Sequence, residues 1–123
     1  MGLIYKPVTL IGTKGTKTFR TLMDTGASRC YIRKKEAGFI APPYKIATPM
    51  ELRLGKGKTQ VDELLVSFIE LNGLRMHWAF IIVPKLTEEL IIGADFFQRW
   101  KIKLDPGAED IIIDLSALKI QMV

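Results

Sequence analysis

One carboxylate in this chain stands where a side chain can do chemistry. The apolar run Thr21–Met23 predicts a buried strand, and it ends at Asp24. Thr25 and Gly26 follow at once, and both are residues that favour turns. A strand that stops at a carboxylate on a glycine-containing turn presents the acid instead of burying it. We therefore predict that Asp24 is a functional acid.

Two motifs carry a family resemblance. The segment Leu22–Ser28 resembles the Asp-Thr-Gly-Ala/Ser signature of aspartic proteases. The segment Ile91–Phe97, Ile-Ile-Gly-Ala-Asp-Phe-Phe, resembles the apolar-apolar-Gly motif that lies beside the catalytic loop of retropepsin-like proteases and opens their C-terminal helix. About seventy residues separate the motifs, as in retroviral and retrotransposon proteases. The resemblance implies one retropepsin-like domain over residues 1–123, an all-β closed barrel with one short C-terminal helix, active as a homodimer.

Peptide hydrolysis by carboxylates explains why a dimer is expected. One carboxylate accepts a proton from water while the other donates to the carbonyl oxygen. Two carboxyl groups held close share one proton, so each can take one role. The chain has one Asp-Thr-Gly and is too short for the two-lobed pepsin architecture. If it is an aspartic protease, the second Asp24 comes from a second copy across a two-fold axis.

The resemblance also assigns roles to the neighbours of Asp24. Thr25 resembles the residue whose hydroxyl locks the two catalytic loops together across the dimer. Gly26 lets the backbone approach substrate where a Cβ would obstruct. Ala27 and Ser28 are expected at the substrate pocket, although retroviral proteases often carry Asp where Ser28 stands. That departure leaves no carboxylate to contact the substrate backbone there.

The second motif is expected to support the first. Ile92 and Gly93 are predicted to pack against the Asp24 loop. Asp95 is predicted to brace the helix that starts at Ala94, and it is not our candidate for the second catalytic acid.

A hairpin over 50–66 resembles the protease flap in position. Its tip carries Gly55, Lys56 and Gly57, which we predict to contact substrate. Glycines allow such a tip to move and to cover an extended peptide, excluding water. Retroviral flaps are richer in glycine and apolar residues, so this tip departs from theirs by its lysines.

Turn residues divide the chain into short strands. Asn72-Gly73 is a strong hairpin signal. Three prolines make 39–49 a loop or extended segment. The helix is expected over Ala94–Trp100, with at most a helical turn over Lys34–Ala37. Strands are predicted over Leu3–Ile11, Thr16–Met23, Arg29–Arg33, Met50–Leu54, Thr59–Leu71, Leu74–Val83, Glu88–Ile92, Lys101–Leu104, Asp110–Leu115 and Leu118–Val123.

Composition sets the broad class. Apolar residues make up 48% of 123 residues, as in a globular protein, and no run is long enough to span a bilayer. No secretory signal is visible at the N-terminus. Cys30 is the sole cysteine, which excludes an internal disulfide and suits a reducing compartment, so we expect a cytoplasmic protein. The start at Met1 favours a stand-alone cellular or prokaryotic enzyme, although an excised retroelement domain would look the same.

Two classes of function remain open. The first is a homodimeric aspartic endopeptidase acting on an extended peptide or protein, without cofactor or metal. The second is a catalytically silent retropepsin-fold module that dimerises or binds peptide or nucleic acid. The net charge of +5 makes nucleic acid conceivable, but the basic residues are scattered, so we prefer a solvated surface.

Several other residues have simple structural interpretations. His77 has no cluster of Cys, His or carboxylate around it in the sequence, so we expect it to be packed or solvated and not a metal ligand. Cys30 is expected to be a small buried residue, with an oxidisable thiol near the site as the alternative. Phe96, Phe97 and Trp100 are expected in the core.

Overall fold

The computed structural model describes residues 3–54 and 57–114. It consists mostly of strands, as predicted, with two short helices. The elements in chain order are β1 (Ile4–Ile11), β2 (Thr16–Met23), β3 (Tyr31–Arg33), α1 (Lys34–Ala37), β4 (Tyr44–Leu54), β5 (Gly57–Leu71), β6 (Leu74–Val83), β7 (Leu90–Ile92), α2 (Ala94–Arg99), β8 (Ile102–Asp105) and β9 (Asp110–Ile113).

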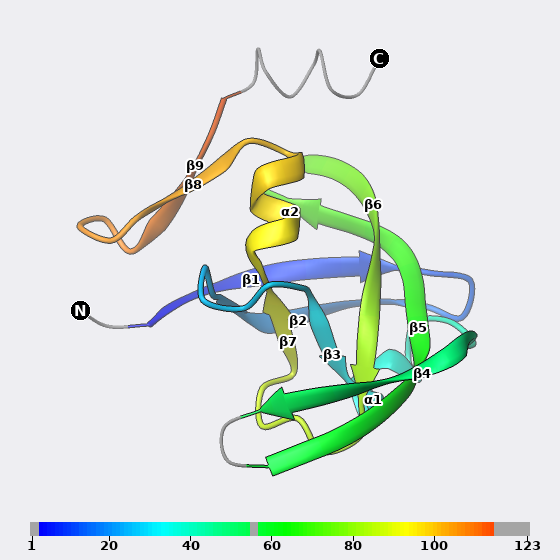
Figure 1. Ribbon diagram of the computed structural model, residues 1–123. Coiled ribbons are helices and arrows are strands. Elements are labelled where there is room, and N and C mark those ends of the chain that lie inside the picture. Colours follow the sequence, from blue (N-terminus) through cyan, green and yellow to red (C-terminus); the bar gives the residue numbers. More distant parts are fainter. Residues whose placement is uncertain (1–2, 55–56, 115–123) are drawn as a thin grey trace.

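Six strands close into a barrel (Figure 1). Their order is β1-β2-β7-β3-β6-β5, and β5 pairs back onto β1, with Leu10 opposite Ile69. The β2–β7 and β3–β6 pairs are parallel and the other pairs are antiparallel. Strand β4 is added outside the ring on β5, and β8 with β9 forms a separate two-stranded sheet. The predicted closed β-barrel is confirmed.

Local sequence signals account for most element ends. Strands β2 and β6 have the predicted bounds. Asn72 and Gly73 have φ values of 51° and 77°, the left-handed conformation that a tight two-residue hairpin turn requires. The segment 39–49, expected as loop or extended chain, is a strand from Tyr44 onward. Its pairing with β5 shifts register between Lys45 and Met50, and Pro49, which has no N–H to donate, lies in that interval.

The helical turn expected over Lys34–Ala37 is present as α1, beside the predicted helix α2. A bidentate ion pair closes the single turn of α1: the Arg33 guanidinium donates to both Glu36 carboxylate oxygens, at 2.5 and 2.9 Å. This pairing lowers the pKa of Glu36, with the hydrogen bonds from Arg33 as the main cause. The Gly38 N–H then bonds the Lys34 carbonyl at 3.2 Å as the helix ends.

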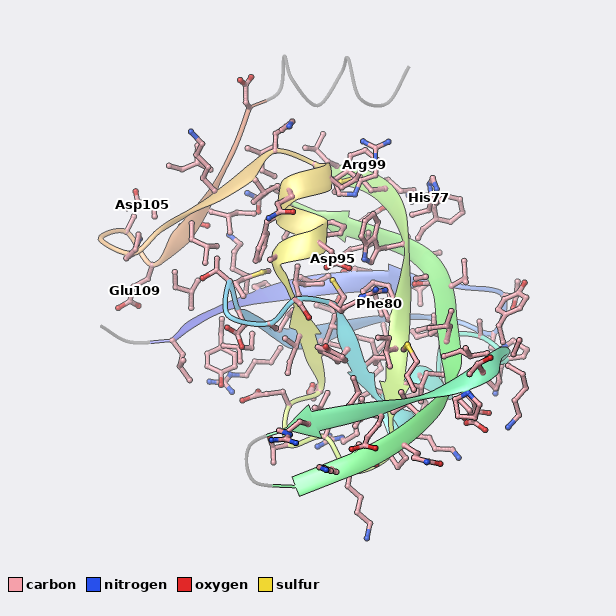
Figure 2. All side chains as sticks on the ribbon, in the orientation of Figure 1. His77, Phe80, Asp95, Arg99, Asp105 and Glu109 are labelled. Carbon is pink, nitrogen blue, oxygen red and sulfur yellow. The ribbon has the colours of Figure 1, made fainter. Side chains whose placement is uncertain are left out.

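The core has two parts. The larger fills the barrel and reaches α2, where Phe96, Phe97 and Trp100 are buried as predicted. Phe96 stacks edge-on against Trp78, with ring centroids 5.3 Å apart. Phe80 is fully buried in the barrel, whereas His77 on the same strand lies on its outer side (Figure 2). The smaller part joins residues beside Asp24 to the β4–β5 hairpin; its buried members are Leu22, Tyr31, Val61, Ile81, Val83, Leu86 and Ile91.

No helix within the described part of the chain has the length and apolarity needed to cross a bilayer.

Candidate active site

Backbone hydrogen bonds hold the turn that carries Asp24. Asp24 follows β2, and its N–H donates to the Ile92 carbonyl at 2.9 Å. The Ala27 N–H donates to the Asp24 carbonyl at 3.1 Å, closing the turn. The Gly26 N–H donates to Asp24 Oδ1 at 2.9 Å, so one carboxylate oxygen is oriented by the turn itself. The acid is half-buried, between buried Met23 and exposed Thr25, on a fixed backbone and in reach of solvent.

The two sequence motifs meet at this turn. Strands β2 and β7 run parallel, with Met23 opposite Ile92. A Cβ on Gly93 would lie 2.2 Å from the Arg29 carbonyl oxygen and 2.7 Å from that of Ala27. Such distances are impossible for a side chain, so only glycine permits this packing. The Ala94 N–H also donates to the Ala27 carbonyl, at 2.7 Å.

Cys30 and Asp95 form a second layer behind the turn. The Gly93 N–H donates to Cys30 Sγ at 3.4 Å, and the Cys30 thiol donates to Asp95 Oδ1 at 3.4 Å. Burial of Cys30 raises the pKa of its thiol far above the ordinary value. The thiol is therefore a protonated packing group with little reactivity, which favours the small buried residue over the oxidisable thiol.

Asp95 is engaged in structure, as expected. Its Oδ1 accepts the Phe96 N–H at 2.8 Å as well as the Cys30 thiol, at the start of α2 (Figure 2). The Asp95 N–H reaches the Ser28 carbonyl at 3.3 Å, which ties α2 to the end of the Asp24 turn. Sequence reasoning missed this link between Cys30 and Asp95, because 65 residues separate them and neither belongs to a recognisable pair.

The remaining predicted site residues lie around Asp24. Thr25, Gly26 and Ser28 are exposed, and Ala27 is partly buried against the smaller core. A Cβ on Gly26 would come within 3.1 Å of Asp24 Oδ1, so a side chain there would crowd the acid. The roles of Thr25 across a dimer and of Ala27 and Ser28 toward substrate stay predictions.

The expected flap is the β4–β5 hairpin. Gly55 and Lys56 lie outside the described residues. Gly57 is exposed, and a Cβ there would meet nothing within 4 Å. Met50 and Leu52 are partly buried against the smaller core, so the hairpin shares an apolar layer with the residues that flank Asp24. Its role as a mobile cover stays a prediction.

Comparison with known families decides the relationship. Residues 11–99 match the model of the family described as "gag-polyprotein putative aspartyl protease". The chain belongs to this family. The match spans both the Asp24 turn and the Gly93 motif. No curated protein is significantly similar in sequence.

Solved structures agree with the family in fold. The retroviral protease-like domain of Ddi1 from Leishmania major aligns with a TM-score of 0.67 at 20% identity, covering 93% of this chain and 89% of that domain. EIAV protease, in complex with the inhibitor HBY-793, aligns with a TM-score of 0.62 at 18% identity, covering 85% of this chain and 93% of the protease. The barrel is therefore retropepsin-like, as the sequence predicts.

Proposed function

We propose that this member of the aspartyl protease family is a homodimeric endopeptidase that hydrolyses peptide bonds between two Asp24 carboxylates, one from each subunit. The observation that carries the proposal is the Asp24 turn. Its backbone is pinned to Ile92 and Gly93, one carboxylate oxygen is oriented by the Gly26 N–H, and the acid remains accessible. A structural acid of a barrel needs neither the accessibility nor the glycine beside it.

The proposed dimer follows from the single Asp-Thr-Gly motif, because the mechanism needs two catalytic carboxylates. The chain carries one Asp-Thr-Gly, and Asp95, the acid of the second motif, is occupied by Cys30 and Phe96. A two-fold axis beside the exposed Thr25–Gly26 edge of the turn brings two Asp24 side chains face to face. Thr25 then lies where its hydroxyl can bond the partner loop.

The proposed mechanism uses the pair as general base and general acid. The ionised Asp24 takes a proton from water, and the resulting hydroxide attacks the scissile carbonyl carbon. The protonated Asp24 gives its proton to the carbonyl oxygen. Collapse of the tetrahedral intermediate breaks the C–N bond, and a proton passes to the leaving amine. Because one of the two acids must be protonated and the other ionised, the rate should peak at acidic pH.

Replacing the acid tests the proposal. Asp24→Asn keeps the shape of the side chain but cannot take up a proton from water, so cleavage of an unstructured protein should fall by at least about 10³-fold. Glu70→Gln, an exposed acid-to-amide change in an ion pair with Arg75, is the matched control and should keep activity. Turnover of well-folded Asp24→Asn at the wild-type rate would rule out the pair. A dimer that binds peptide or nucleic acid without any cleavage would identify a silent module.

A further inference from the structure

Strand β5 is paired with β6 over only part of its length, and the part of β5 nearest the hairpin tip is not paired with β6. Their pairing ends at Leu64 opposite Ile81. Beyond that point β6 stays in the barrel, with Val83 opposite Arg33 of β3. The first half of β5 leaves with β4, where Thr59 pairs with Leu52. The two strands therefore open into a wedge at the end of the molecule where β5 begins (Figure 1).

The wedge holds a hollow of about 410 Å³. One wall is the β5 edge at Gly57, Lys58 and Thr59, and the other is the segment 83–85, Val-Pro-Lys. Successive residues of a strand direct their N–H and C=O groups to opposite edges, and β4 occupies one edge here. At least one of the three β5 residues thus directs backbone donor and acceptor into the hollow. An extended polypeptide is the ligand whose backbone matches such an edge.

The charge around the wedge is positive. Lys58 and Lys85 are exposed on its two walls, and Arg53 stands directly opposite Lys58 in the hairpin register. Like charges opposite each other on a sheet destabilise it. Lys58 forms an ion pair with Glu51 at 3.4 Å, and both side chains are more than half exposed. Within the described part of the chain no ion pair involves Arg53 or Lys85, so of these three cations only Lys58 is paired with a carboxylate.

We infer that this wedge, which is bounded by Lys58 and the β5 edge on one side and by Lys85 on the other, is a binding site for an acidic extended segment of a polypeptide. Backbone hydrogen bonds to the β5 edge align the segment, and its anionic side chains lie against the two lysines. Val83 and Thr59 continue into the apolar layer and hairpin beside Asp24, so the wedge adjoins the proposed cleft. The bound segment is then part of the substrate, outside the residues held at Asp24.

Nucleic acid fits this hollow less well. The lining contains no aromatic side chain on which a base could stack, and two lysines make a short electrostatic track. The anionic group itself can be an Asp or Glu carboxylate or a phosphate on serine, and peptides with either group separate these two sources.

As a statement about substrates the inference rests on the proposed function, but binding does not require cleavage. Binding is therefore measured on the Asp24→Asn protein, by fluorescence anisotropy of labelled unstructured peptides that differ only in a block of Glu, Gln, Lys, Ser or phosphoserine. The Glu peptide should bind about fivefold tighter than the Gln peptide at low salt, and the advantage should shrink as salt rises. A phosphoserine advantage without a Glu advantage would assign the site to phosphorylated segments.

Charge variants locate the effect. Lys58→Gln with Lys85→Gln should abolish the Glu advantage, and Lys58→Glu with Lys85→Glu should reverse it toward the Lys peptide. Lys103→Gln is the matched control, because Lys103 is an exposed lysine on β8, far from the start of β5 (Figure 1). The same peptides are then offered to the wild type as substrates. Binding with the expected charge dependence but without cleavage would contradict the proposed endopeptidase function and support the wedge as a binding site.

Other results would overturn the inference. Equal binding of Glu and Gln peptides, or a Glu advantage that survives in the double Gln variant, would show that the wedge is not the site. Cleavage of the Glu and Gln peptides at equal rates would also show that the wedge is not the site, but it would agree with the proposed endopeptidase function. Tighter binding of single-stranded oligonucleotides than of the Glu peptide, lost in the same variant, would assign the wedge to nucleic acid.

Discussion

At the scale of single residues, the site depends on places where a side chain is excluded as much as on the acid. Gly93 lets β7 lie against the Asp24 turn, where an added Cβ would collide with two carbonyl oxygens. Gly26 leaves room for the Asp24 carboxylate that its own N–H orients. Cys30 fills the space behind them as a buried thiol. The position of the Asp24 carboxylate is thus fixed by hydrogen bonds from backbone groups.

Gly93→Ala is expected to damage both stability and activity. Its methyl group would meet backbone oxygens of Arg29 and Ala27, which cannot move without displacing the Asp24 turn. Overpacking of this kind costs about 1–3 kcal/mol in unfolding free energy. Gly107→Ala is the control, since a Cβ there would make only an ordinary contact, 3.5 Å from Asp105 Oδ1. Urea denaturation and peptidase assays of both variants measure the difference; equal effects would show that the Gly93 contact is unimportant.

At the scale of elements, the barrel supports the Asp24 turn, and the β4–β5 hairpin is the expected cover. Strands β2 and β7 carry the two motifs side by side, and their parallel pairing fixes the register between Asp24 and Gly93. The β4–β5 hairpin extends beyond the ring and packs through Met50 and Leu52. Rigid strands beneath and a two-stranded arm above are what a cleft with a movable cover requires.

Gly57→Val tests the arm as a flap. The Cβ of a valine there would have nothing within 4 Å, and its branched side chain would stiffen the strand beside the tip. We expect turnover to fall several-fold while the midpoint of thermal unfolding stays within a few degrees, because mobility of the arm serves catalysis and not folding. Unchanged turnover in a stable variant would contradict the flap role.

Helix α1 is expected to make stability depend on pH. The hydrogen-bonded pair with Arg33 lowers the pKa of Glu36 in the folded state. Its stabilisation is therefore complete above the unfolded carboxyl pKa, about 4.3, and is lost as pH falls through the lower folded pKa. Glu36→Gln should cost about 1–3 kcal/mol at pH 7, and the difference from wild type should shrink in strong acid. Urea titrations at both pH values measure this, and a difference that grew in acid would exclude the pair as its source.

At the scale of the whole molecule, the C-terminal sheet is a candidate for the contact between subunits. Strand β9 pairs with β8 alone among the described strands, and Ile112 on it is 52% exposed. Lys6 holds Asp110 at 2.6 Å, which ties β9 to β1 and lowers the pKa of Asp110. The predicted strand Leu118–Val123 lies outside the described residues. We expect β9 to pair with its copy, because an unpaired strand edge is prone to association.

Subunit exchange tests the shared site. If each site needs an Asp24 from both chains, a dimer with one Asp24→Asn subunit is inactive. Wild type mixed with an equal amount of mutant should then lose roughly half its activity, because about half its subunits enter mixed dimers. Mass-tagged subunits show that exchange has occurred. Full activity after proven mixing would mean that each chain holds a complete site.

The sequence by itself determined the features that depend on short-range chemistry. The Asp24 turn, the Asn72-Gly73 hairpin and the bounds of β2 and β6 follow from turn residues and alternating apolar positions within a few residues of each other. The resemblance of two motifs then led to the closed barrel. The roles of Thr25 and Ser28 were assigned in the same way and remain predictions.

The tertiary structure alone decided the contacts between distant segments. The chain of hydrogen bonds from Gly93 through Cys30 to Asp95 joins backbone and side-chain groups more than sixty residues apart. The break in β4 pairing and the divergence of β5 from β6 depend on which strand edges remain free once the barrel closes. Closure is set by packing of the whole core, and packing leaves no local pattern in the sequence from which these positions could be read.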